Sequence, residues 1–282
     1  MDAKDISQNS RHTVTGKLKV LVLTGQQRGW PAIALETLAD ANPQLELSVI
    51  LAPSGPRGIE KKIKRALGKI AAHGIDVVIG GMWMRRRLDN VTMAAPTIEE
   101  VCVPRGIKIH VQTDMNSAAA AALACSLAPD VVLSLGNGWL SKRIYGCSRI
   151  AALNVHHEML PDFPGAPPVI HSLAAGLPQT GYTIHQLTPQ IDRGPIVARG
   201  IVPIRFESSL ELSIEKTITL LYHASAKELS RLLSTSTPEF GTIEIKEYSP
   251  QTHYTTPTLR VIIKARRTWK AKLKSESLAK RH

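Results

Sequence analysis

The chain has 282 residues, and 43% of them are hydrophobic, which is enough to bury a sizeable core and excludes a chain that is disordered throughout. The formal net charge is +12. Nine Lys or Arg and one acid lie in residues 260–282, so this segment carries +8 and leaves +4 for the rest. The bulk of the protein is therefore only mildly basic, and its overall charge says little about an active site.

Cysteine usage and the lack of long apolar stretches indicate a cytoplasmic protein. Cys102, Cys125 and Cys147 are far apart and form no CxxC pair, which argues against a disulfide framework and against a zinc site. Residues 1–16 are polar and are typical of a short disordered leader rather than of a signal peptide. The uncharged, alanine-rich stretch Met115–Pro129 is too short to span a bilayer. We therefore expect no membrane partner.

The chain opens as strand, helix and strand. Lys19–Thr24 is a continuous apolar run of the kind that forms a strand buried on both faces of a parallel sheet. Pro31 suits the first turn of a helix that extends to about Asp40, and Leu45–Ala52 is the next strand. This order predicts an α/β fold with a doubly wound, mostly parallel, Rossmann-like sheet. The loop Thr24–Trp30 has neither GxGxxG nor a Walker lysine, so it gives little support to dinucleotide binding.

Further elements follow the same patterns along the chain. Asn116 is expected to cap an alanine-rich helix that Pro129 ends, and Ser208 with Glu211 to form a capping box for a long helix to about Leu233. The other predicted elements are a helix with a basic solvent face, Ile59–His73; strands at Val77–Ile79, Ile107–Val111, Val131–Leu135, Ala151–His156, Tyr182–Leu187 and Pro195–Pro203; and a small strand-like region, Thr242–Tyr248.

Three polar residues lie at or between the later strands. Asn154 and His156 are two positions apart at the end of a buried strand, so the alternation of a strand puts both side chains on one face. Asp192 lies in a turn, Asp192–Gly194, between the two strands that follow. Open α/β sheets place their ligands at strand ends. We therefore expect a functional site here.

These residue types suit acyl transfer to an amine. A histidine moves protons near neutral pH, an asparagine amide donates to an oxyanion, and a carboxylate holds the protonation state of the histidine. Each also has a structural interpretation, because a strand-end Asn or His is often a satisfied polar group and Asp-x-Gly is often a turn. No metal site is expected, because no carboxylate or cysteine lies at ligand spacing from the candidate histidines, His156, His157, His171 and His185.

The ordered set of motifs resembles the folate-dependent formyltransferase family. The motifs are Asn154-x-His156, the loop Leu160-Pro-x-Phe-x-Gly165, Gly181-x-Thr-Ile-His185 and Ile191-Asp-x-Gly-Pro-Ile196, and the resemblance is strongest from Pro129 to Pro203. It implies that Asn154, His156 and Asp192 carry catalysis and that the donor is 10-formyltetrahydrofolate. It also implies that the pterin lies against the backbone of two segments, Asn137, Gly138, Trp139 and Leu140, and Thr188, Pro189, Gln190 and Ile191.

This resemblance divides the chain into a leader, residues 1–16, a formyltransferase catalytic domain, 17–205, a C-terminal helix with a small strand region, 206–258, and a basic tail, 259–282. The 78 residues after Ile204 do not comfortably hold the separate barrel of the initiator-tRNA enzymes. The loop Gly25-Gln-Gln-Arg28 lacks the Gly-Ser-Asn of the phosphoribosylglycinamide enzymes. The expected function is therefore formyl transfer to the amine of a small molecule, with an amino sugar nucleotide as the first candidate.

Other functions stay open at this stage. The main alternative is a methionyl-tRNA formyltransferase that acts on an aminoacyl-tRNA amine, and phosphoribosylglycinamide formyltransferase is a weaker one. A nucleic-acid-binding module is the rival from another class, because the basic tail has Trp269 among its lysines and arginines. We interpret that tail as a solvated or disordered end. The sequence leaves the acceptor and the oligomeric state undetermined.

Overall fold

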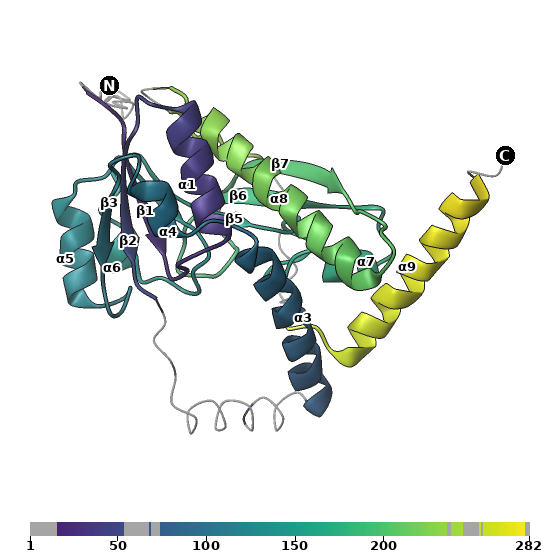
Figure 1. Ribbon diagram of the computed structural model, residues 1–282. Coiled ribbons are helices and arrows are strands. Elements are labelled where there is room, and N and C mark those ends of the chain that lie inside the picture. The colour runs from purple at the N-terminus through teal and green to yellow at the C-terminus, as the bar shows by residue number, and fades with distance from the viewer. Residues whose placement is uncertain are drawn as a thin grey trace, which may run out of the picture.

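The computed structural model describes residues 16–53, 68, 74–235, 238–244, 254 and 256–279. In these residues a seven-stranded sheet has the order β3-β2-β1-β4-β5-β6-β7 and is covered by helices on both faces (Figure 1). The strands are β1 (Lys19–Thr24), β2 (Glu46–Leu51), β3 (Lys108–Val111), β4 (Val131–Ser134), β5 (Ala151–His156), β6 (Gln179–Gln186) and β7 (Ile196–Pro203). The strands β1 to β5 pair in parallel, whereas β6 runs antiparallel to β5 and β7. The predicted doubly wound, mostly parallel sheet is confirmed.

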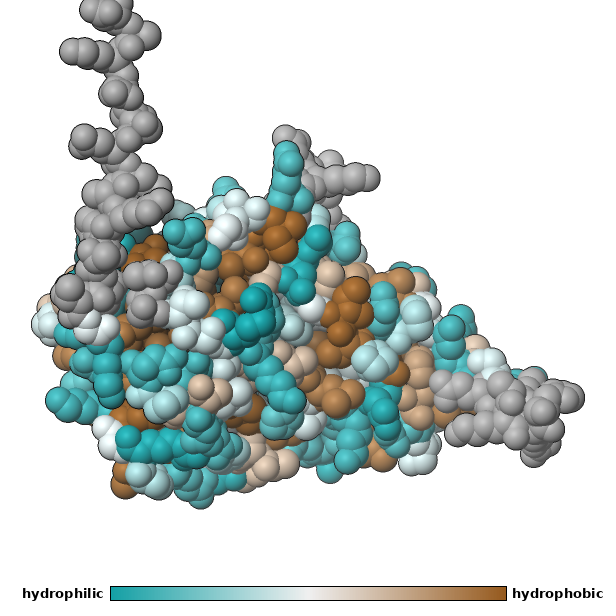
Figure 2. Space-filling model, turned by 90° about the horizontal axis from the view of Figure 1, so that it is seen from above, coloured by the Kyte–Doolittle hydropathy of each residue, from teal (hydrophilic) through white to brown (hydrophobic). Residues whose placement is uncertain are grey.

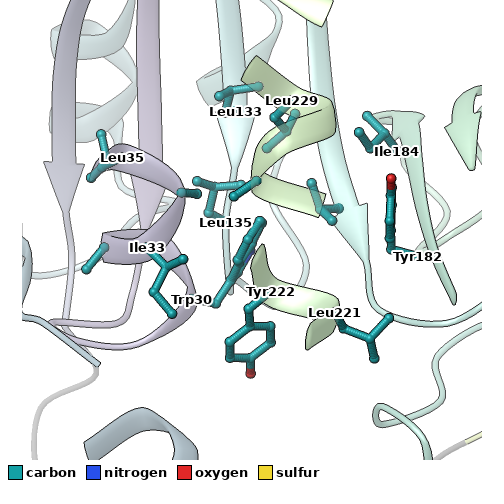
Figure 3. Packing of buried hydrophobic residues seen from close by; sticks show 14 of the residues in the cluster. Trp30, Ile33, Leu35, Leu133, Leu135, Tyr182, Ile184, Leu221, Tyr222 and Leu229 are labelled. Atoms are coloured by element: carbon teal, nitrogen blue, oxygen red, sulfur yellow. The ribbon is translucent and has the colours of Figure 1, made fainter. Parts of the chain in front are cut away.

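The central strand β1 is buried on both faces, as its unbroken apolar run predicts. Val20 and Val22 pack into the larger hydrophobic cluster, while Leu21 and Leu23 pack into a smaller one on the opposite face. The larger cluster lies under α1 (Trp30–Ala41) and α8 (Leu210–Leu232), and Figure 3 shows side chains of both helices meeting the sheet. The smaller cluster lies under α5 (Ala118–Ser126) and α6 (Lys142–Tyr145).

The expected strand Val77–Ile79 is wrong, because these residues belong to α3 (Ile75–Met93). Its buried Val77, Met84 and Val91 recur every seven residues, which is the spacing of one helical face. Three apolar residues in a row were too short a window to reveal that period. Two short helices complete this part of the fold, α4 (Ile98–Cys102) and α7 (Ile170–Ala174).

The residues that begin two helices are each one position later than expected. Ser117, not Asn116, caps α5, because its side chain accepts the main-chain N–H of Ala120 at 3.1 Å. Ser209, not Ser208, caps α8. In both cases two neighbouring polar residues are suitable caps by type, and only the backbone conformation decides which one precedes the first helical residue.

Residues 259–282, interpreted as a solvated or disordered tail, form a helix, α9, over Leu259–Ala279. One face of α9 is packed, with Ile262 and Ala265 buried and Trp269 partly buried. The Trp269 indole N–H lies 3.1 Å from the hydroxyl of Ser213 on α8. Figure 1 shows α9 extending beyond the sheet, and it contacts α7 and α3. The tail is therefore a docked helix with a basic outer face.

Several expectations lie wholly or partly outside the described residues. These are the leader at residues 1–15, the helix Ile59–His73 apart from Gly68, and residues 245–248 of the strand-like region. In the described part of that region, Ile243 forms one isolated antiparallel bridge to Ile196. On the face in Figure 2, hydrophobic residues lie in small groups between hydrophilic ones. Among the described helices, none is long and apolar enough to cross a membrane.

The Ser209 cap gives a test of the boundary of α8. Ser209→Ala removes the acceptor for the main-chain N–H of Leu212, which lies 3.1 Å away, so the free energy of unfolding should fall by about 1 kcal/mol. Urea denaturation measures the change. Ser208→Ala, at an exposed position beside it, is the matched control and should change stability by less than about 0.5 kcal/mol. Equal losses of stability in the two variants would show that Ser209 is not the residue that caps α8.

Candidate active site

The candidate site is built on the pairing of β5 with its two neighbours. Asn154 lies beside Ser134, the last residue of β4, and directly opposite His185 of β6. Its amide nitrogen Nδ2 is 3.1 Å from Nε2 of His185. His156, two residues further along β5, faces the same side of the sheet. The antiparallel register of β6 therefore brings a second histidine into the site.

Asp192 joins the two histidines. It lies in the turn between β6 and β7 with φ 54°, a left-handed conformation that aspartate tolerates better than most residues. Its carboxylate oxygens lie 3.4 Å from Nδ1 of His156 and 3.5 Å from Nε2 of His185, and one of them accepts the main-chain N–H of Gly165 at 2.9 Å. The structure thus brings Asn154, His156 and Asp192 together, as the sequence motif suggests.

The Asp192 carboxylate is held in its ionised form. Burial by itself raises the pKa of this group, but the hydrogen bond from His185, the charges of His156 and His185 and the N–H of Gly165 outweigh it and lower the pKa to about 2. The site therefore contains a negative charge at neutral pH. This charge favours a protonated imidazole beside it.

The remaining ring nitrogens of both histidines face main-chain carbonyls. Nε2 of His156 is 2.8 Å from the carbonyl oxygen of Phe163, so a protonated ring can donate to Phe163 and Asp192 together. Nδ1 of His185 donates to the carbonyl of Gln186 at 2.9 Å, and its Nε2 lies between Nδ2 of Asn154 at 3.1 Å and an Asp192 oxygen at 3.5 Å. The Asn154 amide carries two N–H donors, so at least one remains for a substrate oxygen whichever group Nε2 pairs with.

His185 is the residue that sequence reasoning missed. The motif Gly181–His185 contains it but assigns it no role, because a motif does not reveal strand register. Gly194 supports its position, since a Cβ there would overlap the carbonyl oxygen of Gln186 and lie 3.3 Å from Nδ1 of His185. Despite this cluster, the described residues include no group of three His, Cys, Asp or Glu side chains arranged to hold a metal ion.

The two loop segments expected to meet a pterin lie next to each other. The indole N–H of Trp139 donates to the carbonyl of Pro189 at 3.1 Å, which joins residues 137–140 to residues 188–191. Trp139 is 52% exposed and Ile191 is 47% exposed, so both present apolar surface to solvent. Within the second segment, the Thr188 hydroxyl donates to the carbonyl of Gln190 at 2.8 Å.

The first of these loops is anchored at its base. The Asn137 amide donates to the carbonyl of Leu23 in β1 at 2.7 Å, and Leu140 is buried. Asn116, expected to cap α5, instead donates to the carbonyl of Trp139 at 3.2 Å and accepts the main-chain N–H of Ser141 at 2.7 Å. The exposed indole therefore rests on a rigid support.

His157 points away from the site, as strand alternation predicts. Its ring packs 4.7 Å from Trp30 and 4.8 Å from Tyr222 in the hydrophobic layer that Figure 3 shows. Nε2 lies 3.2 Å from the Ser225 hydroxyl. Burial, with a contribution from the charge of His156, lowers the pKa of His157 to about 3. It is therefore a neutral core residue.

Glu158 is a buried carboxyl group close to the site. Its Oε2 accepts from the hydroxyls of Ser172 at 2.6 Å and Thr180 at 3.0 Å. Burial raises the pKa of Glu158 to about 7, although these hydroxyls favour the charged form and limit the rise. The group titrates near neutral pH in the folded protein.

An α/β sheet with histidines, an amide and an ionised carboxylate at its strand ends defines an enzyme-like centre for acid–base chemistry. The formyl transferase family model matches residues 19–223. The chain belongs to that family.

Curated relatives share about half of the chain. A methionyl-tRNA formyltransferase from Chlorobium luteolum is 28% identical over 147 residues, which are 51% of this chain and 47% of the relative. One from Halorhodospira halophila is 30% identical over 148 residues, 52% of this chain and 45% of the relative. The chain thus matches less than half the length of these two relatives.

Solved structures share the fold. A phosphoribosylglycinamide formyltransferase from Bacillus halodurans superposes with a TM-score of 0.51 and 18% identity, over 79% of this chain and 98% of that one. A sugar N-formyltransferase from a Shewanella species superposes with a TM-score of 0.53 and 13% identity, over 89% of this chain and 87% of that one. At these identities the likeness establishes the fold alone.

The buried carboxyl of Glu158 predicts a pH dependence of stability. Because its pKa rises on folding from 4.5 to about 7, the folded state binds more protons than the unfolded state in that range. Its contribution is therefore complete below pH 4.5 and is lost as pH rises through 7. Linkage bounds the loss at about 3 kcal/mol.

Urea denaturation of wild type and Glu158→Gln between pH 5 and pH 8 measures this contribution. The difference between the two proteins isolates Glu158, because His157 contributes in the opposite direction in both. Relative to wild type, Glu158→Gln should gain stability as pH rises, by up to about 3 kcal/mol. A difference that does not change with pH would mean that Glu158 does not titrate in this range.

Proposed function

We propose that this chain transfers a formyl group from 10-formyltetrahydrofolate to the amine of a small molecule. The observation that carries the proposal is the ionised Asp192 carboxylate 3.4 Å from His156, with the Asn154 amide on the same face of β5. Membership of the formyl transferase family supports formyl transfer as the reaction. The names of the sequence relatives support the same chemistry.

Each of the three residues has a defined role in this proposal. The free N–H of Asn154 donates to the formyl oxygen as negative charge develops on it. Protonated His156, held by Phe163 and Asp192, stabilises the same charge and supplies a proton. Asp192 relays the proton that the attacking amine loses, through a water molecule, to His156, which has given its own proton to the donor nitrogen. A new bond joins the formyl carbon to the amine, the bond to the donor nitrogen breaks, and that nitrogen takes up a proton.

The two joined loops fit a folate donor. The donor would supply the activated formyl carbon, and its flat pterin suits the apolar surface of Trp139 and Ile191. The hydrogen bond from Trp139 to Pro189 fixes the loops relative to each other before binding. We therefore assign residues 137–140 and 188–191 to donor binding.

Two observations bear on the acceptor. A sugar N-formyltransferase from Shewanella shares the fold over 89% of this chain and 87% of its own length, and this supports a small amine as the acceptor. The second candidate, an aminoacyl-tRNA, rests on the exposed cations of α9, among them Lys264, Arg267 and Lys270. Phosphates bind such surfaces in a salt-dependent way. We favour the small amine.

Substitutions at the centre test the assigned roles. Asn154→Ala, His156→Ala and Asp192→Asn should each lower single-turnover formyl transfer by about 100-fold, because proton transfer and oxyanion donors contribute that much. Calorimetry with a non-reactive 10-formyltetrahydrofolate analogue should give nearly unchanged binding, since the donor rests on the loops.

His157→Ala is the control, because His157 neighbours His156 in the chain but packs on the other face against Trp30. It should lower stability and leave the transfer step largely intact. If His157→Ala loses formyl transfer while His156→Ala keeps it, the mechanism is refuted. Wild-type protein that fails to bind the folate analogue would refute the proposed donor.

The outer face of α9 distinguishes the two acceptors. Replacing Lys264, Arg267 and Lys270 together by Gln removes exposed charge and spares Arg266, which is 2.9 Å from Glu211. Turnover of a small amine should not change, and tRNA should bind the wild type only weakly. If tRNA is the acceptor, its affinity should fall and the slope of log K against log salt should shrink by roughly 2. Titration of tRNA at several salt concentrations measures this.

A further inference from the structure

One loop holds both reacting side chains through its main chain. In the loop Met159–Ala166, the carbonyl of Phe163 lies 2.8 Å from Nε2 of His156, and the N–H of Gly165 donates to Asp192 at 2.9 Å. The orientation of the imidazole and the position of the carboxylate therefore depend on where residues 163–165 lie.

Strands β6 and β7 hold the beginning of this loop. The N–H of Leu160 donates to the Thr183 hydroxyl at 3.0 Å, and its carbonyl accepts from Arg199 at 3.2 Å. Both partners belong to β6 and β7. They fix the residue at the base of the loop, three positions before Phe163, and leave the part that touches the centre to other contacts.

Tyr254 supplies contacts to that part. Its main-chain N–H donates to the carbonyl of Pro164 at 2.8 Å, between the two residues that touch the centre. Its ring lies 5.2 Å from the ring of Phe163 and 4.8 Å from that of His171, which is buried in α7. Tyr254 thus joins the loop to α7 by one hydrogen bond and two aromatic contacts.

The residues after Tyr254 are docked on α3. A Cβ at Gly80 would overlap the main-chain carbonyl of Pro257, and one at Gly81 would lie 2.6 Å from Cγ2 of Thr256. Glycine inside a helix is unfavourable by about 1 kcal/mol relative to alanine. The close approach of Thr256 and Pro257 explains why α3 nevertheless has two successive glycines. Beyond it, α9 packs on α3 and α7. The chain is therefore fixed to the body of the fold on the C-terminal side of Tyr254.

We infer that Tyr254 is a positioning residue for the reaction centre. The C-terminal segment that carries it clamps residues 163–165, so that the Phe163 carbonyl and the Gly165 N–H meet His156 and Asp192. Tyr254 touches neither reacting side chain. The effect of Tyr254 on catalysis rests on the proposed formyl transfer. Its effect on the position of residues 163–165 does not. Displacement of a catalytic group by about 1 Å lowers rates on the order of 100-fold.

The experiment compares four variants with the wild type. Tyr254→Ala removes the ring contacts, and Tyr254→Phe keeps both the ring and the main-chain N–H. Gly80→Ala crowds the Pro257 carbonyl from α3 without touching the loop, and it raises helix propensity, so it is expected to fold. Leu38→Ala, on the buried face of α1, is a control that lowers stability away from the loop.

Amide hydrogen exchange of Gly165, followed by NMR, reports the clamp without any acceptor. It should accelerate by about tenfold or more in Tyr254→Ala and Gly80→Ala and stay near wild type in Tyr254→Phe and Leu38→Ala. The ¹⁵N resonances of the His156 ring should shift in the first two variants only. Single-turnover transfer should fall at least about tenfold in Tyr254→Ala, with the KM for the donor little changed and activity restored in Tyr254→Phe.

The outcomes separate the two proposals. Unchanged Gly165 exchange in Tyr254→Ala and Gly80→Ala overturns the clamp, and so does an equal acceleration in Leu38→Ala, which would reflect stability alone. If the wild type transfers no formyl group but Gly165 responds as expected, the clamp stands and the proposed function fails. If the wild type is active and Gly165 does not respond, the function stands and the clamp fails.

Discussion

The charge on Asp192 is the constraint on which the site depends. A carboxylate inside a protein loses its hydration, and it stays ionised only where donors and positive charge replace the water. Here the imidazoles of His156 and His185 and the N–H of Gly165 do so. These partners come from β5, β6 and the loop after β5. The ionised state of one side chain thus requires that three separate segments be placed correctly.

The strand β5 separates reaction chemistry from packing. His156 faces the centre, while His157, one position later, lies neutral between Trp30 and Tyr222 in the core. Adjacent histidines thus have opposite environments because successive side chains of a strand point to opposite faces. Glu158 continues the chain into a pocket of hydroxyls from Ser172 and Thr180. These three side chains form a buried, hydrogen-bonded polar group.

The C-terminal elements pack on the body of the fold, and one of their residues reaches the loop at the site. Trp269 and Arg266 of α9 bond to α8, and Tyr254 reaches the loop that holds His156. The family model matches residues 19–223, so Tyr254 lies outside the matched region and its partner Pro164 lies inside it. The C-terminal segment is thereby connected to the loop at the candidate centre.

Local sequence determined most of the framework. The apolar run Lys19–Thr24 has no polar position to turn toward water, so it had to be a strand covered on both faces. The motif Asn154-x-His156 placed two side chains on one face for the same local reason, the two-residue period of a strand. Prediction from local sequence was wrong at Val77–Ile79, where the helical spacing shows only over a longer stretch. It was also wrong at Ser208, because the backbone decides which of two neighbouring serines caps the helix.

Only the tertiary structure decided which distant groups complete the site. The register of β6 against β5 set His185 opposite Asn154, and nothing within either strand fixes that pairing, because register follows from how whole faces pack. The same holds for Tyr254, which is 90 residues from its partner Pro164. The composition of the C-terminal segment predicted the basic charge of α9, but it did not predict that this helix packs on α3 and α7. The sequence determined the chemistry that each residue offers, and the packing of separate segments determined which residues act on one another.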